Sequence, residues 1–200
     1  MIGAKLVFPG PHLDGKSLYE LLEAEKVTFS AGVPTVWLGL INFAQAGKLK
    51  FSTLRRTVIG GSACPPAMMR TLEDDFGIEV IHAWGMTEMS PLGTLSKLKA
   101  KHAALDLESQ RRILEKQGKV IFGVDMEIID DDGASLPWDG QASGNLVVRG
   151  PWVIQSYFRR SESPLVGVDG RQWFPTGDVA AIDADAFMQI TDRSKDVIKS

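Results

Sequence analysis

The amino-acid sequence predicts an α/β fold, in which a parallel-sheet α/β subdomain is followed by a small β-barrel subdomain. In the first part, strand-like apolar runs alternate with helical patterns, which is typical of a parallel sheet with crossover helices. After Gly118, short alternating strands separated by turn residues take over, which is typical of a small barrel or sandwich. We therefore assign residues 1–119 and 120–191 to the two subdomains and leave residues 192–200 as a stub.

The α/β part begins with an apolar run at residues 5–8, which we interpret as a strand. Leu18, Leu21 and Leu22 then lie on one face of a predicted helix, and Asp14 can cap that helix. The segment 34–46 starts at a proline and is apolar nearly all round. That pattern predicts a buried helix.

Three further short apolar runs, at residues 27–30, 57–59 and 79–81, predict strands. A helix at residues 66–76 connects the last two of them. Proline opens this helix, where the first turn tolerates it, and Gly77 follows its end. Strand, helix and strand at this spacing predict parallel neighbours in one sheet.

The second part starts after a charged helix at about residues 105–117. Residues 124–128 alternate apolar and polar side chains as a half-buried strand does, and residues 145–148 are predicted to form another strand. Residues 178–183 and 187–191 are separated by turn residues, which predicts a hairpin.

Composition and charge exclude several kinds of partner and site. Lys plus Arg is 22 and Asp plus Glu is 25, so the net charge of −3 gives no reason to expect nucleic acid or an anionic membrane. The single cysteine, Cys64, excludes a disulfide framework and a cysteine metal cluster. The apolar run within residues 1–9 is too short for a signal peptide, and the longest apolar stretch, residues 32–41, is far below the ~20 residues that a membrane span needs. We expect a cytoplasmic protein.

Both ends of the sequence look cut. The first residues begin in a strand-like run, and residues 196–200 stop within a patterned apolar and basic segment. We expect a piece of a longer enzyme, truncated at both ends, rather than a small domain with short termini.

Two motifs in the α/β part carry residue types suited to nucleotide chemistry. Residues 60–63 (Gly-Gly-Ser-Ala) separate a strand from a helix, and glycine lets a ligand approach the backbone closely there. Residues 82–88 (His-Ala-Trp-Gly-Met-Thr-Glu) follow a strand end, the edge at which parallel sheets bind ligands. Trp84 can stack on a base, Thr87 can bind a phosphate oxygen and Glu88 can hold magnesium.

Two more motifs lie near the C-terminus. In residues 173–178 (Trp-Phe-Pro-Thr-Gly-Asp), the carboxylate of Asp178 can accept hydrogen bonds from both hydroxyls of a ribose. Residues 192–196 (Asp-Arg-Ser-Lys-Asp) are strongly charged. Each motif by itself also fits an ordinary turn or a solvated loop, so their order and spacing carry the argument.

In that order and spacing, the motifs resemble the adenylate-forming (acyl-activating) superfamily of AMP-binding enzymes, most closely its medium- and long-chain fatty acyl-CoA synthetases. The resemblance covers essentially the whole chain. The matching segments are residues 32–37 (Gly-Val-Pro-Thr-Val-Trp), 60–63, 84–88, 176–178 and 192–196. It implies that a carboxylate is activated by ATP as acyl-AMP and then transferred to coenzyme A, with Mg²⁺ as the metal.

For the base, the resemblance implies that Gly61, Ser62 and Ala63 line the adenine pocket. His82 stands where the family has a polar partner for the adenine amino group. Trp84 replaces the more usual tyrosine that stacks on adenine, so the stacking face is kept and the phenol is lost.

For the phosphate and the ribose, Thr87 and Glu88 form the implied catalytic pair, in which Thr87 binds the α-phosphate and Glu88 holds magnesium. Asp178 binds both ribose hydroxyls, and Arg193 also contacts the ribose. The remaining implied positions are Gly85 and Met86, which pass between the nucleotide and the acyl pocket, and Lys195, the hinge to a missing C-terminal domain.

The resemblance also implies missing parts. The family's Ser/Thr/Gly-rich phosphate loop would precede residue 1, and the C-terminal domain with the adenylation lysine would follow Ser200. We therefore expect the chain alone to be inactive in ligation. Ala186 stands where the family usually has glycine, and because a positive φ is awkward for alanine, a different turn is open there.

Three functional hypotheses stay open at this point. The leading one is part of a fatty acyl-CoA synthetase, whose partners are a small-molecule carboxylate, ATP and coenzyme A. The second is an aryl- or amino-acid-activating adenylation domain; Met86 favours acyl-CoA ligases, because peptide-synthetase members usually carry proline in that segment. The third is a non-catalytic nucleotide-binding module. The acyl chain is not predicted, and a homo-oligomer is left open.

Overall fold

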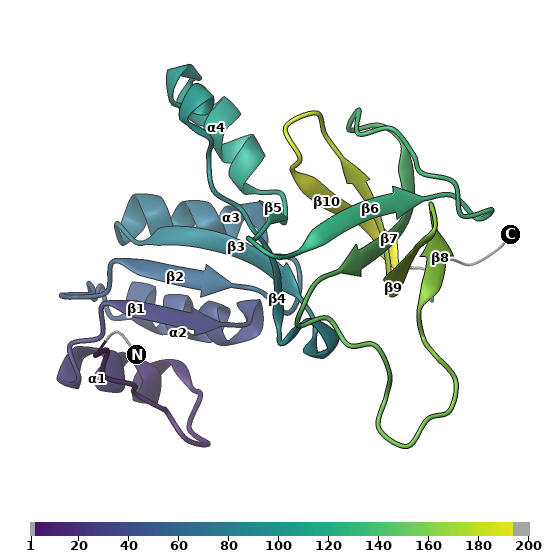
Figure 1. Ribbon diagram of the computed structural model, residues 1–200. Coiled ribbons are helices and arrows are strands. Elements are labelled where there is room, and N and C mark those ends of the chain that lie inside the picture. The colour runs from purple at the N-terminus through teal and green to yellow at the C-terminus, as the bar shows by residue number, and fades with distance from the viewer. Residues whose placement is uncertain (1–2, 194–200) are drawn as a thin grey trace, which may run out of the picture. The chain divides into compact units, whose positions relative to one another are not determined.

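The computed structural model describes residues 3–193, and the chain divides into two compact units, Met1–His82 and Ala83–Ser200. The division lies within strand β3 (Glu79–Gly85), whereas the sequence pattern changes near Lys119. The predicted subdomain boundaries stay predictions. The predicted fold class is confirmed, since parallel strands with crossover helices are followed by a curled antiparallel sheet (Figure 1).

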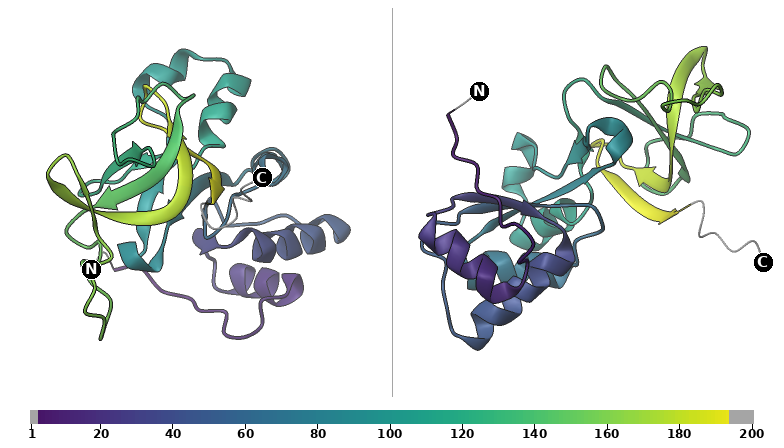
Figure 2. Two further views of the ribbon diagram at one scale, coloured as in Figure 1. Left: turned by 90° about the vertical axis from the view of Figure 1, so that its right-hand side faces the viewer. Right: turned by 90° about the horizontal axis from the view of Figure 1, so that it is seen from below.

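Two helices of the first unit lie side by side (Figure 2). Helix α1 (Gly15–Ala24) begins where the Asp14 carboxylate accepts a hydrogen bond from the Ser17 N–H at 3.0 Å, as a cap does. Helix α2 (Pro34–Ala46) starts at its proline and buries an apolar face that includes Trp37.

The first unit's sheet is parallel. Strands β1 (Phe29–Gly32) and β2 (Arg56–Ile59) pair with each other, and β2 pairs with the start of β3. Helix α3 (Pro66–Arg70) continues into a π-helical turn (Thr71–Asp75) and connects β2 to β3. The N-terminal strand predicted at residues 5–8 was wrong: this segment forms no strand, and Leu6 and Phe8 are exposed. An apolar run becomes a strand only where a neighbouring strand satisfies its backbone.

The second unit begins with the end of β3, which pairs antiparallel with β4 (Leu92–Leu95); β4 in turn pairs with β5 (Lys119–Val120). Two 3₁₀ turns and one helix lie between these strands. Their bounds are Thr87–Met89 for η2, Ala100–Ala104 for η3 and Leu107–Leu114 for α4. None of the helices within residues 3–193 has both the length and the apolarity to cross a membrane.

The remaining strands form the curled sheet, in the order β10-β9-β7-β6, with β8 paired to β9. Their bounds are Asp125–Ile129 for β6, Ser143–Arg149 for β7, Val166–Val168 for β8, Arg171–Ile182 for β9 and Met188–Arg193 for β10. The predicted hairpin is confirmed as β9–β10. Alternate apolar side chains of these strands form a buried core that includes Leu146, Phe174 and Met188.

Candidate functional site

A bulge in β9 carries the predicted ribose-binding motif. Asn145 and Val147 of β7 pair with Val179 and Pro175, so three residues of β9 lie opposite one residue of β7. Gly177 has a φ of +79°, which glycine adopts without steric cost. Such bulges redirect side chains and are frequent beside functional sites.

Hydrogen bonds hold the bulge in place. The Thr176 hydroxyl donates to the Leu146 carbonyl at 2.9 Å and accepts from the Asp178 N–H at 3.1 Å. The backbone that precedes Asp178 is therefore tied to the neighbouring strand. This fixes the backbone position from which the Asp178 side chain extends.

Asp178 meets Trp84 inside the second unit. The indole Nε1–H of Trp84 donates to Asp178 Oδ2 at 2.9 Å, and both side chains are only 8% exposed. A buried donor and a buried carboxylate thus satisfy each other, although 94 residues separate them in the sequence. The carbon edge of the indole lies against Gly93, where a Cβ would come within 2.6 Å of the ring.

Arg193 lies at the end of β10, which pairs with β9. In the β9–β10 ladder its backbone lies at the register position opposite Asp178. The predicted hinge residue, Lys195, lies outside the described residues.

The predicted catalytic pair lies in the 3₁₀ turn η2, directly after β3. Thr87 is exposed and Glu88 is half-buried. The Tyr157 hydroxyl donates to Glu88 Oε1 at 2.9 Å. Partial desolvation and the neighbouring carboxylate raise the pKa of Tyr157 above its ordinary value, so the phenol keeps the proton that it donates.

Gly85 and Met86 link this turn to β3. A Cβ added to Gly85 would overlap the carbonyl oxygen of Pro91, so only glycine fits there. Met86 is half-buried and packs against the core of the second unit. Close packing is thus a sufficient structural reason for both residues, and their predicted positions between nucleotide and acyl group stay predictions.

The predicted adenine loop lies in the first unit. Gly61, Ser62 and Ala63 are exposed and form the turn after β2. A Cβ on Gly61 would lie 3.1 Å from Val33, which follows β1, so the turns after both strands meet at this edge of the sheet.

The buried ring of His82 is hydrogen-bonded to this loop. Its ring is 1% exposed, and Nε2 accepts a hydrogen bond from the Cys64 N–H at 3.1 Å. In the neutral ring the proton therefore resides on Nδ1. Burial raises the pKa of the Cys64 thiol to about 12, so Cys64 is a packing residue and not a thiolate nucleophile at neutral pH.

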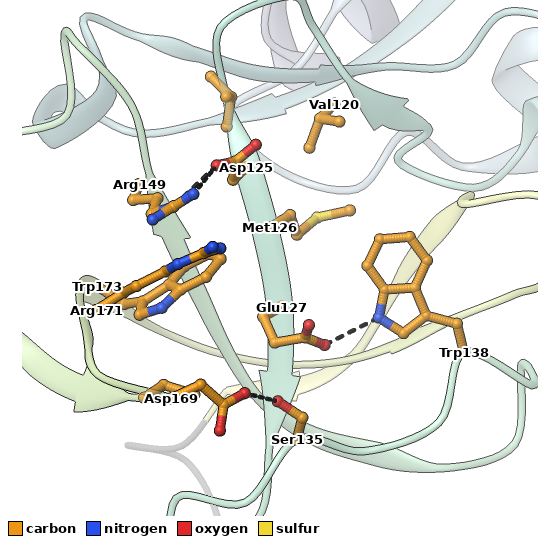
Figure 3. A pocket seen from close by; sticks show the side chains of 12 residues that line it. Val120, Asp125, Met126, Glu127, Ser135, Trp138, Arg149, Asp169, Arg171 and Trp173 are labelled. Atoms are coloured by element: carbon orange, nitrogen blue, oxygen red, sulfur yellow. Dashed lines mark hydrogen bonds and ion pairs between the residues drawn. The ribbon is translucent and has the colours of Figure 1, made fainter.

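A pocket of about 400 Å³ lies elsewhere in the second unit, beside β6 (Figure 3). Arg149 pairs with Asp125, and the Trp138 indole N–H donates to Glu127 at 3.0 Å. Asp125, Glu127 and Arg149 are therefore already engaged with other side chains of this pocket. Its lining includes none of the predicted site residues.

Within each unit, the structure brings together part of the predicted set. In the second unit it joins Trp84 to Asp178, with Arg193 opposite in register. In the first unit it joins His82 to the loop that carries Gly61–Ala63. Sequence analysis missed Tyr157, because a single tyrosine in a loop, 69 residues from Glu88, carries no local signal of that contact.

Comparisons with known proteins agree with the motif order. The model of a family described as "AMP-binding enzyme" matches residues 1–158. The chain is 50% identical over 200 residues to the 3-methylmercaptopropionyl-CoA ligase of Ruegeria pomeroyi. It is 51% identical over 201 residues to the medium-chain-fatty-acid–CoA ligase of Ectopseudomonas oleovorans. Each alignment covers 100% of this chain and 36% of the relative, so the chain spans about a third of their length.

A solved structure extends the similarity to three dimensions. The chain superimposes on a long-chain-fatty-acid-CoA ligase from Archaeoglobus fulgidus with a TM-score of 0.74 and 27% identity. The match covers 90% of this chain and 37% of that one. The resemblance deduced from the motifs is therefore confirmed by sequence and by fold.

Proposed function

This chain belongs to the family of AMP-binding enzymes, and we propose that it holds the adenosine part of ATP in an ATP-dependent fatty acyl-CoA synthetase. The observation that carries the proposal is the hydrogen bond between Trp84 and Asp178 at 2.9 Å. One residue was predicted as the base platform and the other as the ribose acceptor, from motifs far apart in the sequence. Their direct contact supports the assignment of both residues to one site.

In this proposal, Asp178 accepts hydrogen bonds from the ribose hydroxyls, and Arg193 contacts the ribose from the next strand. Trp84 restrains the carboxylate through its N–H, and part of its indole ring stacks on the adenine base. Gly61, Ser62 and Ala63 line the adenine. His82 is buried, so we assign it an action through the loop, by holding the Cys64 N–H, rather than a direct contact with the base.

Thr87 and Glu88 have the chemistry that magnesium and phosphate require. Hydroxyl and carboxylate oxygens are hard ligands, and Mg²⁺ is typically bound by one or two carboxylates together with substrate phosphates. Among the described residues, no group of three or more His, Cys, Asp or Glu could hold a metal alone. A single carboxylate such as that of Glu88 fits Mg²⁺ that is bound mainly through the phosphates of ATP. Bound magnesium would neutralise phosphate charge.

The proposed reaction has two steps. A substrate carboxylate attacks the α-phosphorus of ATP, which gives an acyl adenylate and releases pyrophosphate. The thiol of coenzyme A then attacks the acyl carbon and AMP leaves. The first step brings an anion to a polyanion, so alignment and charge neutralisation matter more than acid–base catalysis. Thr87, which binds the α-phosphate in this proposal, supplies part of that alignment.

The names of two relatives, a 3-methylmercaptopropionyl-CoA ligase and a medium-chain-fatty-acid–CoA ligase, support a proposal on the substrate class. We propose a short or medium-chain aliphatic carboxylate. Val33, Trp37 and the Gly60–Gly61 turn would border its pocket, since Gly61 lies against Val33. A cytoplasmic location is part of the same proposal.

The test is calorimetric titration of the purified protein with AMP in the presence of Mg²⁺. We expect saturable binding, in the millimolar range for this chain alone, because weak contacts must offset an association cost of roughly 4–15 kcal/mol. Trp84→Ala and Asp178→Ala should abolish it. Trp173→Phe and Asp125→Ala are matched controls from the same unit and should bind as the parent does. Absence of binding, or equal binding by all variants, would refute the proposal.

A further inference from the structure

Three hydrogen bonds attach the turn η2 to the loop of residues 150–158. The Ile154 N–H donates to the Glu88 carbonyl at 2.9 Å, and the Tyr157 hydroxyl donates to Glu88 Oε1 at 2.9 Å. The Ser90 hydroxyl donates to the Trp152 carbonyl at 3.4 Å. Glu88 is thus held by the same loop through its main chain and through its side chain.

We infer that Tyr157 is a positioning residue for magnesium, whose hydroxyl orients the Glu88 carboxylate toward the metal. The inference rests on the proposed function, in which Glu88 is the magnesium ligand. A carboxylate has two oxygens with about four lone-pair sites. One oxygen can accept from Tyr157 while the other coordinates the metal, so the two interactions are compatible.

The backbone on both sides of Tyr157 fixes where the phenol can reach. Ile154, three residues earlier, is bonded to the Glu88 carbonyl, and the Arg160 N–H donates to the Tyr157 carbonyl at 3.2 Å, which closes a turn. The backbone that carries the phenol is therefore held in place by hydrogen bonds. Because a free glutamate side chain loses rotamer freedom on binding a metal, this restraint lowers the entropic cost of binding.

A purely structural role for this hydrogen bond is the competing interpretation. Tyr157 is 44% exposed, and a hydrogen bond at such a site contributes little to stability, because water replaces it. Groups that hydrogen-bond a metal ligand, by contrast, typically change metal affinity 10–100-fold when they are removed. The two interpretations therefore predict different results for one substitution.

The experiment uses the chain's two tyrosines as a matched pair. Tyr157→Phe removes the hydroxyl that bonds Glu88, and Tyr19→Phe removes one that donates to the Lys50 carbonyl at 2.9 Å in the first unit. For each variant, the ATP dissociation constant is measured by calorimetry with saturating Mg²⁺ and again with EDTA. The ratio of the two constants reports the coupling between magnesium and nucleotide.

We expect Tyr157→Phe to lower this coupling about 10-fold or more, with the EDTA value unchanged. The magnesium concentration needed for half-maximal effect should rise. Tyr19→Phe should match the parent. In the Glu88→Gln background, Tyr157→Phe should have no further effect, since the two residues then act through one contact.

Each other outcome contradicts the inference in a distinguishable way. Unchanged coupling in Tyr157→Phe would refute it and leave the proposed function standing. A loss of ATP affinity in EDTA would show a structural role and refute it as well. If ATP binding by the parent is insensitive both to magnesium and to Glu88→Gln, the assignment of Glu88 fails, and this inference fails with it.

Discussion

The predicted ribose contact in the second unit consists of buried side chains, whereas the predicted adenine loop in the first unit is exposed main chain. Asp178 and Trp84 are each 8% exposed and satisfy each other. Residues 61–63 are exposed, and the contact that anchors their loop is the bond from the Cys64 N–H to His82. One region is part of a hydrophobic core, and the other is a loop resting on one buried ring. A substitution in the Asp178–Trp84 pair should therefore lower the stability of the whole second unit. A substitution that loosens the loop of residues 61–63 should have only a local effect.

The largest expected effect is a loss of unfolding free energy in the Asp178→Ala variant. This variant leaves the buried indole N–H of Trp84 without its carboxylate, and an unsatisfied buried donor costs about 1–3 kcal/mol. Urea denaturation should show that loss. Asp178→Asn keeps an oxygen that can accept from the indole and should lose less. Asp125→Ala, which removes an exposed ion pair with Arg149, should cost at most about 1 kcal/mol; an equal loss in that control would refute the comparison.

The second effect is local and concerns His82→Phe. Phenylalanine fills the buried site but cannot accept from the Cys64 N–H, which loses about 1 kcal/mol of interaction. Hydrogen exchange of the Cys64 amide should become about 5-fold to 10-fold faster, while the exchange of amides in β9 should not change. Faster exchange throughout both units would show that the loop is no more local than the Asp178 region.

The third effect is a pH dependence in the hairpin that presents Asp178. Asp185, in its turn, bonds to Lys101, to His102 and to Lys99, and these contacts hold the pKa of its carboxyl well below its ordinary value of 3.8. A lowered carboxyl pKa in the folded state gives stability that is present above the unfolded value and is lost as pH falls below it.

Asp185→Asn should therefore lower stability at pH 7 and make acid unfolding below about pH 5 less steep. Thermal unfolding at a series of pH values measures both. A variant whose pH profile stays parallel to that of the parent would contradict the assignment. Asp139→Asn, in a loop of the same unit, is a useful comparison because the pKa of Asp139 is lowered by backbone N–H groups rather than by cations.

Local signals in the sequence were enough to predict much of the fold. The cap at Asp14, the proline at the start of α2 and the alternating pattern that predicted β6 each act within a few residues, and each element was found. The N-terminal run at residues 5–8 was misassigned because its composition fits a strand, while strand formation depends on a pairing partner elsewhere.

The contacts that define the site were harder to predict for a similar reason. Trp84 and Asp178 are 94 residues apart, and Tyr157 and Glu88 are 69 apart. No local pattern encodes such pairs: the register and bulge of β9 position Asp178, and the loop of residues 150–158 positions Tyr157, only after folding. Resemblance to a family supplied the residue roles, but the identity of the hydrogen-bond partners required the structure.

The smallest expected effect lies at Ala186, in the turn between β9 and β10. The different turn that alanine left open did not occur, because Ala186 adopts a left-handed φ of +64°. A non-glycine residue with this φ costs roughly 1–2 kcal/mol in the folded state. Glycine removes that cost, but part of the gain is offset because glycine gives the unfolded chain more conformational entropy. Ala186→Gly should therefore raise the unfolding free energy by about 0.5–1 kcal/mol in urea denaturation. AMP affinity should stay unchanged, since the buried Asp178–Trp84 pair is already held by the core; a change in affinity without a change in stability would show that the turn, and not the core, positions Asp178.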